Sequence, residues 1–335
     1  MTRCFPTSLR SLLLGGVLFA APATGVAQQE QPLSQWQRQP ASYWAEQLTE
    51  ADVQTAWYAA YALGQKGPEA AGQVDALLAA LMQYEPAERE HVRAAAAWAL
   101  GRIGPAAEPA VPELIETLQL RRDSQLHSLR RNAARALGRI GPAAASAVPV
   151  LESVLEDRDP LVRVAAAHAL WELTERRESL SVLATIGRQT THPTAALAAV
   201  AALGEIGPKQ EAVLPFLATL LGHAEADIAR IAARALGKQG EASLPVLEES
   251  VGSSEEVVRR HAVEALGWMG PESIDLLVAA LHDEAAAVRR AAARALGRLG
   301  PAAQKAEPAL IEALGDSQAE VRQAVAEALR RIRHR

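Results

Sequence analysis

A pattern of apolar positions recurs nine times along the chain, and each copy contains one leucine near its end. Counted from this leucine, apolar residues stand mostly eight, five, four and one positions before it, at it and three after it. This spacing predicts the buried face of a helix of about thirteen residues. The leucines follow one another at intervals of 30 to 37 residues, a period typical of a solenoid. They are Leu63, Leu100, Leu137, Leu170, Leu203, Leu236, Leu266, Leu296 and Leu329.

Alanine precedes the leucine in every copy, and a Gly-Pro pair such as Gly104-Pro105 follows most copies. We expect the glycine to adopt the left-handed conformation that ends a helix, and the proline to prevent its continuation. A second apolar helix is predicted before each copy, often with a proline near its start, as at Pro112 and Pro149. Two such helices form an antiparallel pair. Residues 41–335 are therefore predicted to fold as an all-α solenoid, or superhelix, of about nine pairs.

The motif Asp-x-x-x-x-Val-Arg, followed by Ala-Ala-x-Ala-Leu-Gly-x-Ile-Gly, resembles the HEAT repeat. The resemblance covers about residues 41–335 and is greatest to the bacterial subclass labelled phycobilisome-lyase HEAT-like. It implies a polar ladder of aspartate and arginine side chains between stacked repeats. The ladder residues would be Asp157, Arg163, Asp283, Arg289, Asp316 and Arg322. Three units keep the arginine without the preceding aspartate, which predicts breaks in the ladder at Arg93, Arg130 and Arg259.

Residues 1–27 do not follow the repeat and read as a secretory signal peptide. Arg3 and Arg10 form a positive start, an apolar run follows, and small residues suit cleavage after Ala23 or Ala27. The apolar run is shorter than the roughly 20 residues that span a bilayer. Cys4, the sole cysteine, precedes the apolar run. We expect residues 28–40 to be a flexible polar lead-in, and the protein to be exported to the periplasm or the extracellular space.

Residues that would carry catalysis are not grouped in this sequence. The eight histidines are scattered, with no metal-ligand spacing, so no metal and no cofactor is predicted. Deoxyhypusine hydroxylase, an enzyme built on HEAT-like repeats, binds iron through His-Glu dipeptides, and this chain contains none. No residue set matches a bilin lyase site, and no nucleophile or phosphate-loop motif is present. The sequence therefore predicts a protein that is not an enzyme.

One stripe of the leucine-containing helix is left free by the repeat pattern. Its positions, six and two before the leucine and two after it, share one helical face. We call these 27 positions the second-helix stripe; twelve are arginine or lysine and four are glutamate, in a chain of formal net charge −5. The predicted partner-binding residues are Trp57, Tyr61, Trp98, Arg102, Arg131, Arg135, Arg139, Arg230, Arg234, Lys238, Arg260, Trp268, Arg290, Arg294 and Arg298. The other members are Gln65, Ala94, Val164, His168, Glu172, Leu197, Ala201, Glu205, Glu264, Gln323, Glu327 and Arg331.

Stacking would align the stripe along the concave surface, as the resemblance implies, and solenoids commonly bind partners there. The leading interpretation is a non-enzymatic, exported scaffold that binds a protein with an acidic surface. Binding of an anionic polymer or ligand in the same basic groove is the main alternative. A lyase or hydroxylase related to other HEAT-like enzymes, and nucleic-acid binding, are less favoured. The units of Leu170 and Leu203 depart from the pattern, which predicts a kink, a change in superhelical curvature, a local partner site or ordinary drift of the repeat.

Overall fold

The computed structural model describes residues 39–50, 52–83, 89–120, 126–206 and 211–333. The predicted signal peptide and nearly all of the predicted lead-in lie outside these ranges. Within them the chain is helical and contains no strand. The first helices of the pairs are α2 (Ala41–Glu50), α4 (Val74–Leu81), α6 (Val111–Gln119), α8 (Val148–Val154), α10 (Arg177–Gly187), α12 (Leu214–Thr219), α14 (Leu244–Val251), α16 (Ile274–Ala280) and α18 (Glu307–Ala313). The second helices are α3 (Val53–Lys66), α5 (Glu90–Ile103), α7 (His127–Ile140), α9 (Pro160–Thr174), α11 (Pro193–Glu205), α13 (Ala226–Lys238), α15 (Glu256–Met269), α17 (Ala286–Leu299) and α19 (Ala319–Arg333).

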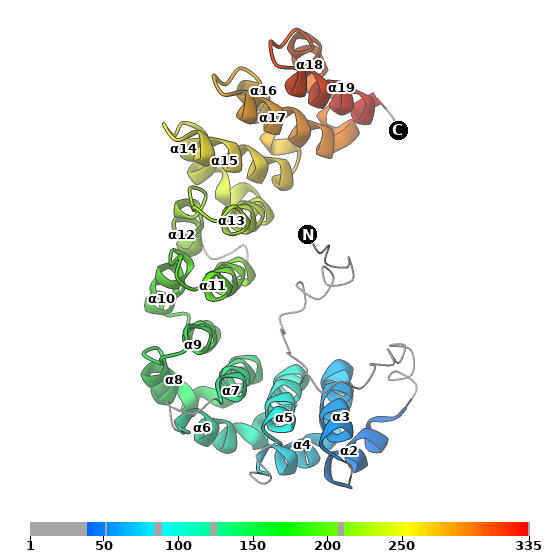
Figure 1. Ribbon diagram of the computed structural model, residues 1–335, viewed down its shortest axis with the longest axis vertical. Helices are drawn as coiled ribbons and strands as arrows, with labels where there is room; N and C mark the ends of the chain where they lie inside the picture. The colour runs from blue at the N-terminus through cyan, green and yellow to red at the C-terminus, as the bar shows by residue number, and fades with distance from the viewer. Residues whose placement is uncertain (1–38, 51, 84–88, 121–125, 207–210, 334–335) are drawn as a thin grey trace, which may run out of the picture. The chain divides into compact units, whose positions relative to one another are not determined.

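The helices form two layers in the part of the chain from Gln39 onward (Figure 1). Each second helix packs against the second helix of the next pair, and the first helices form the other layer. Nearly all contacts between different units join units that follow one another in the sequence. The prediction of an all-α solenoid of helix pairs is therefore confirmed. None of the helices in the described ranges combines the length and the apolar character needed to cross a membrane.

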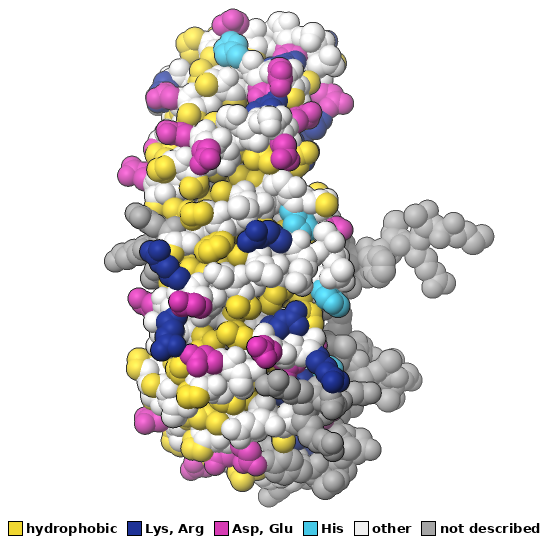
Figure 2. All heavy atoms as spheres, turned by 90° about the vertical axis from the view of Figure 1, so that its left-hand side faces the viewer, with side chains coloured by type: hydrophobic (Ala, Val, Ile, Leu, Met, Phe, Trp, Pro, Cys, Tyr) yellow, Lys and Arg dark blue, Asp and Glu magenta, His cyan; other side chains and the backbone are white. Residues whose placement is uncertain are grey.

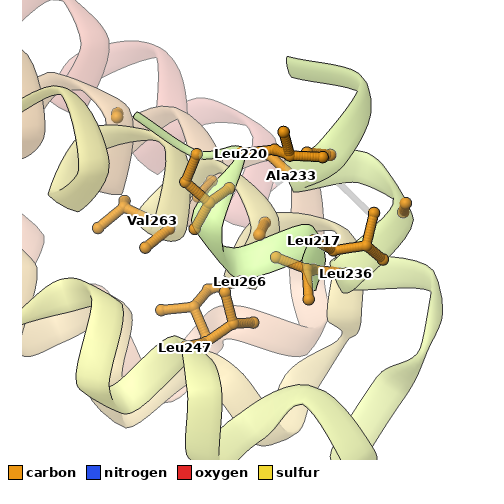
Figure 3. Packing of buried hydrophobic residues seen from close by; sticks show 14 of the residues in the cluster. Leu217, Leu220, Ala233, Leu236, Leu247, Val263 and Leu266 are labelled. Atoms are coloured by element: carbon orange, nitrogen blue, oxygen red, sulfur yellow. The ribbon is translucent and has the colours of Figure 1, made fainter. Parts of the chain in front are cut away.

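The repeated leucines are buried, and those from Leu203 to Leu329 belong to one continuous hydrophobic core. Each of the nine is at most 6% exposed. Figure 3 shows how Leu236 and Leu266, from α13 and α15, pack with Leu217 and Leu247 from the first-helix layer. Each buried leucine removes apolar surface from water on its own unit and on the adjoining unit. The stability of the fold therefore comes from the stacking of units on one another and not from a single unit alone.

Between the two layers, several Gly-Pro pairs begin a short 3₁₀ segment instead of only ending a helix. After α5 this segment is η4 (Gly104–Ala110), and after α7 it is η5 (Gly141–Ala147). Gly104 has φ 78° and ψ −138°. This backbone region is the mirror image of the extended region, which glycine alone adopts without strain, and differs from the left-handed helical conformation that the sequence predicted. Glycine is therefore required more strictly than at a left-handed helical position, because asparagine does not adopt this φ and ψ without strain.

A second glycine, within the helix, sets how closely neighbouring second helices approach. Gly101 follows Leu100 on α5, and a Cβ atom added to it would lie 2.8 Å from the Cα of Ala136 on α7. The same contact recurs between Gly297 on α17 and Ala328 on α19, at 3.0 Å. In each unit that follows an inner glycine, the alanine before the repeat leucine is therefore small because it lies against the backbone of the unit before it.

The unit of Leu170 lacks this inner glycine and has Trp171 in its place. The Trp171 side chain is buried, with 7% exposed, among residues of the core shared by the units from α9 to α19. Since an indole is far larger than a hydrogen atom, it holds α9 and α11 apart, and these two helices contact each other less than the other adjacent second helices do. The departure noted in the sequence is thus a change in helix spacing.

Candidate binding surface

The second helices bring the stripe together on one layer, but not all of its residues are on the surface. Ala94, Trp98 and Val164 are 2%, 7% and 2% exposed, so the prediction that they lie on a free surface is wrong. Trp98 is covered because Gly64 on the preceding second helix leaves room for its ring: a Cβ there would lie 2.2 Å from the indole. The close approach of α3 and α5 therefore buries Trp98.

The first section of the stripe is an aromatic stack. Trp57 and Tyr61 are 5.7 Å apart between ring centroids, and Tyr61 and Trp98 are 5.2 Å apart, with interplanar angles of 7° and 10°. Gln65 donates to the hydroxyl of Tyr61 at 2.7 Å. Offset stacking of this kind contributes about 0.5–1.5 kcal/mol per pair beyond area burial. These rings contact one another across two repeats, so much of their surface stabilises α3 against α5.

The central section combines arginines with partly buried acidic and imidazole groups. Arg131, Arg135 and Arg139 lie along α7, and both Glu172 on α9 and Glu205 at the end of α11 interact electrostatically with this row. Burial, together with the charges of Arg131 and Arg139, lowers the pKa of Arg135 to about 10, which Glu205 partly opposes. Desolvation of this size means that α7 does not present three freely hydrated cations.

His168 and Glu172, both on α9, also have strongly shifted pKa values. Burial, helped by the charges of Arg135 and Arg139, lowers the pKa of His168 from 6.5 to about 4. Burial raises the pKa of Glu172 from 4.5 to about 7, against the opposing effect of Arg139. The two side chains lie 3.9 Å apart and are 18% and 32% exposed. At neutral pH, His168 is uncharged and Glu172 is close to its titration midpoint.

The section over α13, α15 and α17 carries seven of the twelve arginine and lysine residues of the stripe, and most of its residues are exposed. Arg234, Lys238 and Arg294 are exposed, and so is Trp268, with 49% of its surface accessible. The guanidinium carbons of Arg234 and Arg298 each lie 5.2 Å from the centroid of the Trp268 ring.

Several other cations of the stripe have nearby acidic partners. Arg230 pairs with Asp227 on its own helix, and Arg290 pairs with Glu320 at the start of α19. Arg331 pairs with Glu327 at 2.8 Å. Arg260 lies 3.3 Å from the imidazole of His261 and makes no ion pair within the described ranges. The free basic character is therefore concentrated around Trp268.

The aspartate and arginine ladder joins consecutive units. Arg130 donates through two nitrogens to the carboxylate of Asp157, and both side chains are buried, with 0% and 1% exposed. Arg259 binds Asp283 with bonds of 2.9 and 3.1 Å. Arg289 binds Asp316 with bonds of 2.6 and 3.0 Å, and this hydrogen bonding lowers the pKa of the Asp316 carboxyl. Bidentate pairs of this kind fix orientation as well as distance.

The ladder is built differently from the sequence interpretation. Arg163 and Arg322 donate to the main-chain oxygens of Asp157 and Asp316 in their own units, at 2.8 and 2.6 Å. The carboxylate of each ladder aspartate instead faces the arginine of the unit before it. Arg130 and Arg259, predicted to mark breaks, therefore hold rungs with the following unit. To form a rung of the ladder, an arginine must therefore be followed by an aspartate in the next repeat; an aspartate in its own repeat does not form one.

Buried polar side chains that the sequence interpretation missed also connect units. Asn132 is fully buried on α7 and donates to the main-chain oxygen of Ala94 on α5 at 2.8 Å. His261 on α15 lies 2.8 Å from the main-chain oxygen of Leu221. The sequence did offer a signal for both residues, because each is polar at a repeat position where most other units have alanine. These residues fix the register between units and contact no open surface.

The opposite layer of the solenoid carries no comparable concentration of one charge. Figure 2 shows the face formed by the first helices, where acidic, basic and apolar side chains are interspersed. Among the residues that the structure describes, no group of three histidine, cysteine or acidic side chains is placed to hold a metal ion. The distinctive surface of the molecule is therefore the second-helix stripe, above all its section on α13, α15 and α17.

Comparison with known proteins identifies the repeat. A sequence profile of HEAT repeats matches residues 41–128, 117–204, 182–267, 213–294 and 274–335. No curated protein matches the chain. A structure of Kap95p with RanGDP is similar over 87% of this chain and 44% of that one, with 14% identity and a TM-score of 0.51. An engineered protein matches with 23% identity over 88% of this chain and 89% of its own, at a TM-score of 0.43. Human deoxyhypusine hydroxylase matches with 22% identity over 88% and 96%, at a TM-score of 0.33.

Proposed function

We propose that this chain, which belongs to the HEAT repeat family, is an exported scaffold without catalytic activity that holds an acidic protein partner against its second helices. One observation carries the proposal. The stripe carries three times as many arginine and lysine residues as glutamates although the whole chain is net negative, at −5. A local surface of sign opposite to the whole molecule guides an oppositely charged partner to that surface.

The exposed cations around Trp268 support a protein partner in particular. Arginine and tryptophan are the residue types that most often dominate the binding energy of protein interfaces. Arg234 and Trp268 are both exposed and in contact, so an approaching surface meets them together. In the Kap95p structure, a solenoid of the same fold is bound to another protein, RanGDP. The HEAT repeat fold is therefore compatible with this use.

The test is partner capture from the native cell envelope by the purified mature chain and a charge-reversed variant. The variant replaces Arg234, Lys238 and Arg294 by glutamate, all on exposed second-helix positions. We expect this variant to lose the partner while its circular dichroism and melting temperature stay unchanged. Because surface charge contacts are screened by salt, capture by the unaltered chain should also weaken as ionic strength rises.

The matched control reverses three exposed cations elsewhere: Arg176, Arg188 and Lys305. Their replacement by glutamate changes the net charge by the same amount, so a general charge effect would reduce capture in both variants. Equal capture by the stripe variant and the unaltered chain would refute the proposal. Retention on dextran sulfate that is lost in the stripe variant, with no protein captured, would favour the anionic-polymer alternative instead.

Export and the lack of catalysis have their own tests. The proposal predicts that the protein is found in the periplasm or medium, with its N-terminus generated by cleavage after Ala23 or Ala27. An uncleaved protein in the cytoplasm would contradict export. Substrate turnover that vanishes on changing a compact cluster of residues, or a tightly bound stoichiometric cofactor, would contradict the scaffold function.

A further inference from the structure

One tryptophan on the basic section lies between two arginines from different repeats. Trp268 stands on α15, while Arg234 comes from α13 and Arg298 from α17. Both guanidinium carbons are 5.2 Å from the ring centroid. Since α13 and α17 flank α15 on opposite sides (Figure 1), the two guanidinium groups reach the ring from the two neighbouring repeats. We call these three residues the Arg-Trp-Arg clamp.

Inner glycines on two successive helices make room for the clamp. A Cβ atom on Gly237 would lie 2.5 Å from the Cβ of Trp268, and one on Gly267 would lie 2.4 Å from a guanidinium nitrogen of Arg298. Arg298 is further held by a hydrogen bond of 3.3 Å to the main-chain oxygen of Glu264. The clamp is thus positioned by the backbone packing of three repeats and is partly ordered before any partner arrives.

The way the arginines contact the ring determines what they can still bind. A guanidinium over an aromatic ring uses its flat face, which leaves hydrogen-bond donors at its edge for a carboxylate. The two guanidinium carbons can be no more than about 10 Å apart. Acidic residues three positions apart in an extended polyproline II chain lie on the same side, about 9 Å apart, and so fit within this limit. Lys238 and Arg294 add positive charge nearby, against the single stripe carboxylate of Glu264.

We propose that the Arg-Trp-Arg clamp is the anchor for an extended acidic segment of the protein partner, with one carboxylate bound to each guanidinium and the chain crossing the exposed edge of Trp268. The inference rests on the proposed function, because it assigns a particular site and a particular acidic segment to the same surface. Because contacts with Trp268 hold both guanidinium groups before binding, less side-chain entropy is lost when a partner binds them.

The test uses a fluorescein-labelled peptide with glutamate at every third position among glycine and serine, and a second peptide of the same composition with its glutamates contiguous. Fluorescence anisotropy measures their affinity for the mature chain and its variants. Trp268→Ala should weaken binding of the spaced peptide by about 5- to 30-fold, and Trp268→Phe by less, since phenylalanine retains a weaker ring face. The spaced peptide should bind the unaltered chain more tightly than the contiguous one.

Tyr43→Ala is the control, because Tyr43 is also an exposed aromatic residue, at 39%, but lies on α2 outside the stripe. It should leave peptide affinity unchanged. If Trp268→Ala binds the spaced peptide as tightly as the unaltered chain does, the clamp is not the anchor, whereas partner capture that depends on the three reversed cations would still support the proposed function. Failure of both the spaced peptide and the partner capture would overturn the two proposals together. Binding of dextran sulfate but of neither peptide would also overturn the clamp proposal.

Discussion

Replacement of Asp157 by asparagine should destabilise the array far more than loss of an exposed ion pair. Asp157 faces Arg130, and the two side chains are 1% and 0% exposed. Asparagine keeps the shape of the side chain and an oxygen for the main-chain N–H of Asp159, which Asp157 binds at 2.9 Å. The substitution therefore removes the negative charge and little else.

The magnitude follows from the charge that is left behind. Arginine keeps its charge under ordinary conditions, so Arg130 would stay charged, buried and without a counter-ion. Breaking a buried pair in this way costs about 3–5 kcal/mol. The comparison is Glu152→Gln, which breaks the pair with Arg176, whose side chains are 48% and 59% exposed. Exposed pairs contribute about 0–1 kcal/mol, so this control should be nearly neutral.

The assay is urea unfolding followed by circular dichroism, with hydrogen exchange of the α9 amides as the local measurement. A second variant combines Arg130→Met with Asp157→Asn, and should recover much of the lost stability because no buried charge remains. A loss below about 1 kcal/mol for Asp157→Asn, equal to that of Glu152→Gln, would refute the account of the ladder as a buried link between repeats.

Three further predictions concern packing and pH. Gly101→Ala should destabilise the fold by about 1–2 kcal/mol in thermal and urea melts, since the added methyl meets Ala136 at 2.8 Å, while Gly72→Ala, which meets nothing within 4 Å, should be neutral or slightly stabilising. The pKa of Glu172 is raised to about 7 in the folded chain, so ionisation of this group lowers the free energy of unfolding as pH rises from about 4.5 to 7. Glu172→Gln should therefore be more stable than the unaltered chain by about 1–2 kcal/mol at pH 8, and no more stable at pH 4. The pKa of His168 is lowered to about 4 in the folded chain, so this group lowers the free energy of unfolding as pH falls from 6.5 to 4. In His168→Gln, the free energy of unfolding should therefore fall less steeply over this pH range. An unchanged pH dependence would contradict the lowered pKa of His168.

The repeat architecture could be predicted from sequence because each of its causes is local. The helical spacing of apolar residues, the repeat leucine itself and a proline near the start of the first helix all act within one unit. The alanine before each leucine was visible, but its reason was not, because Ala136 is restricted by Gly101 on another helix. The glycine after α5 was also found, yet its φ and ψ depend on the 3₁₀ segment that follows.

The candidate surface was only partly predictable, since exposure depends on the neighbouring unit. Helical spacing placed Trp98 and Trp268 at equivalent faces of their helices, but Trp98 is 7% exposed and Trp268 is 49% exposed. Trp98 lies two residues before its leucine and packs over Gly64, whereas Trp268 lies two residues after its leucine, nearer the helix end. The partners of the ladder aspartates were missed for the same reason, because the pairing arginine lies in the preceding unit.

Site-specific photo-crosslinking in the native host tests the central claim most directly. A photoreactive amino acid at Lys238, on the stripe, is compared with one at Arg188, at the end of α10 in the other layer; both positions are exposed. The account predicts an adduct at Lys238, containing an acidic segment of one protein, and none at Arg188. Adducts formed only at Arg188, or equally at both positions, would contradict the claim that the second helices bind the partner.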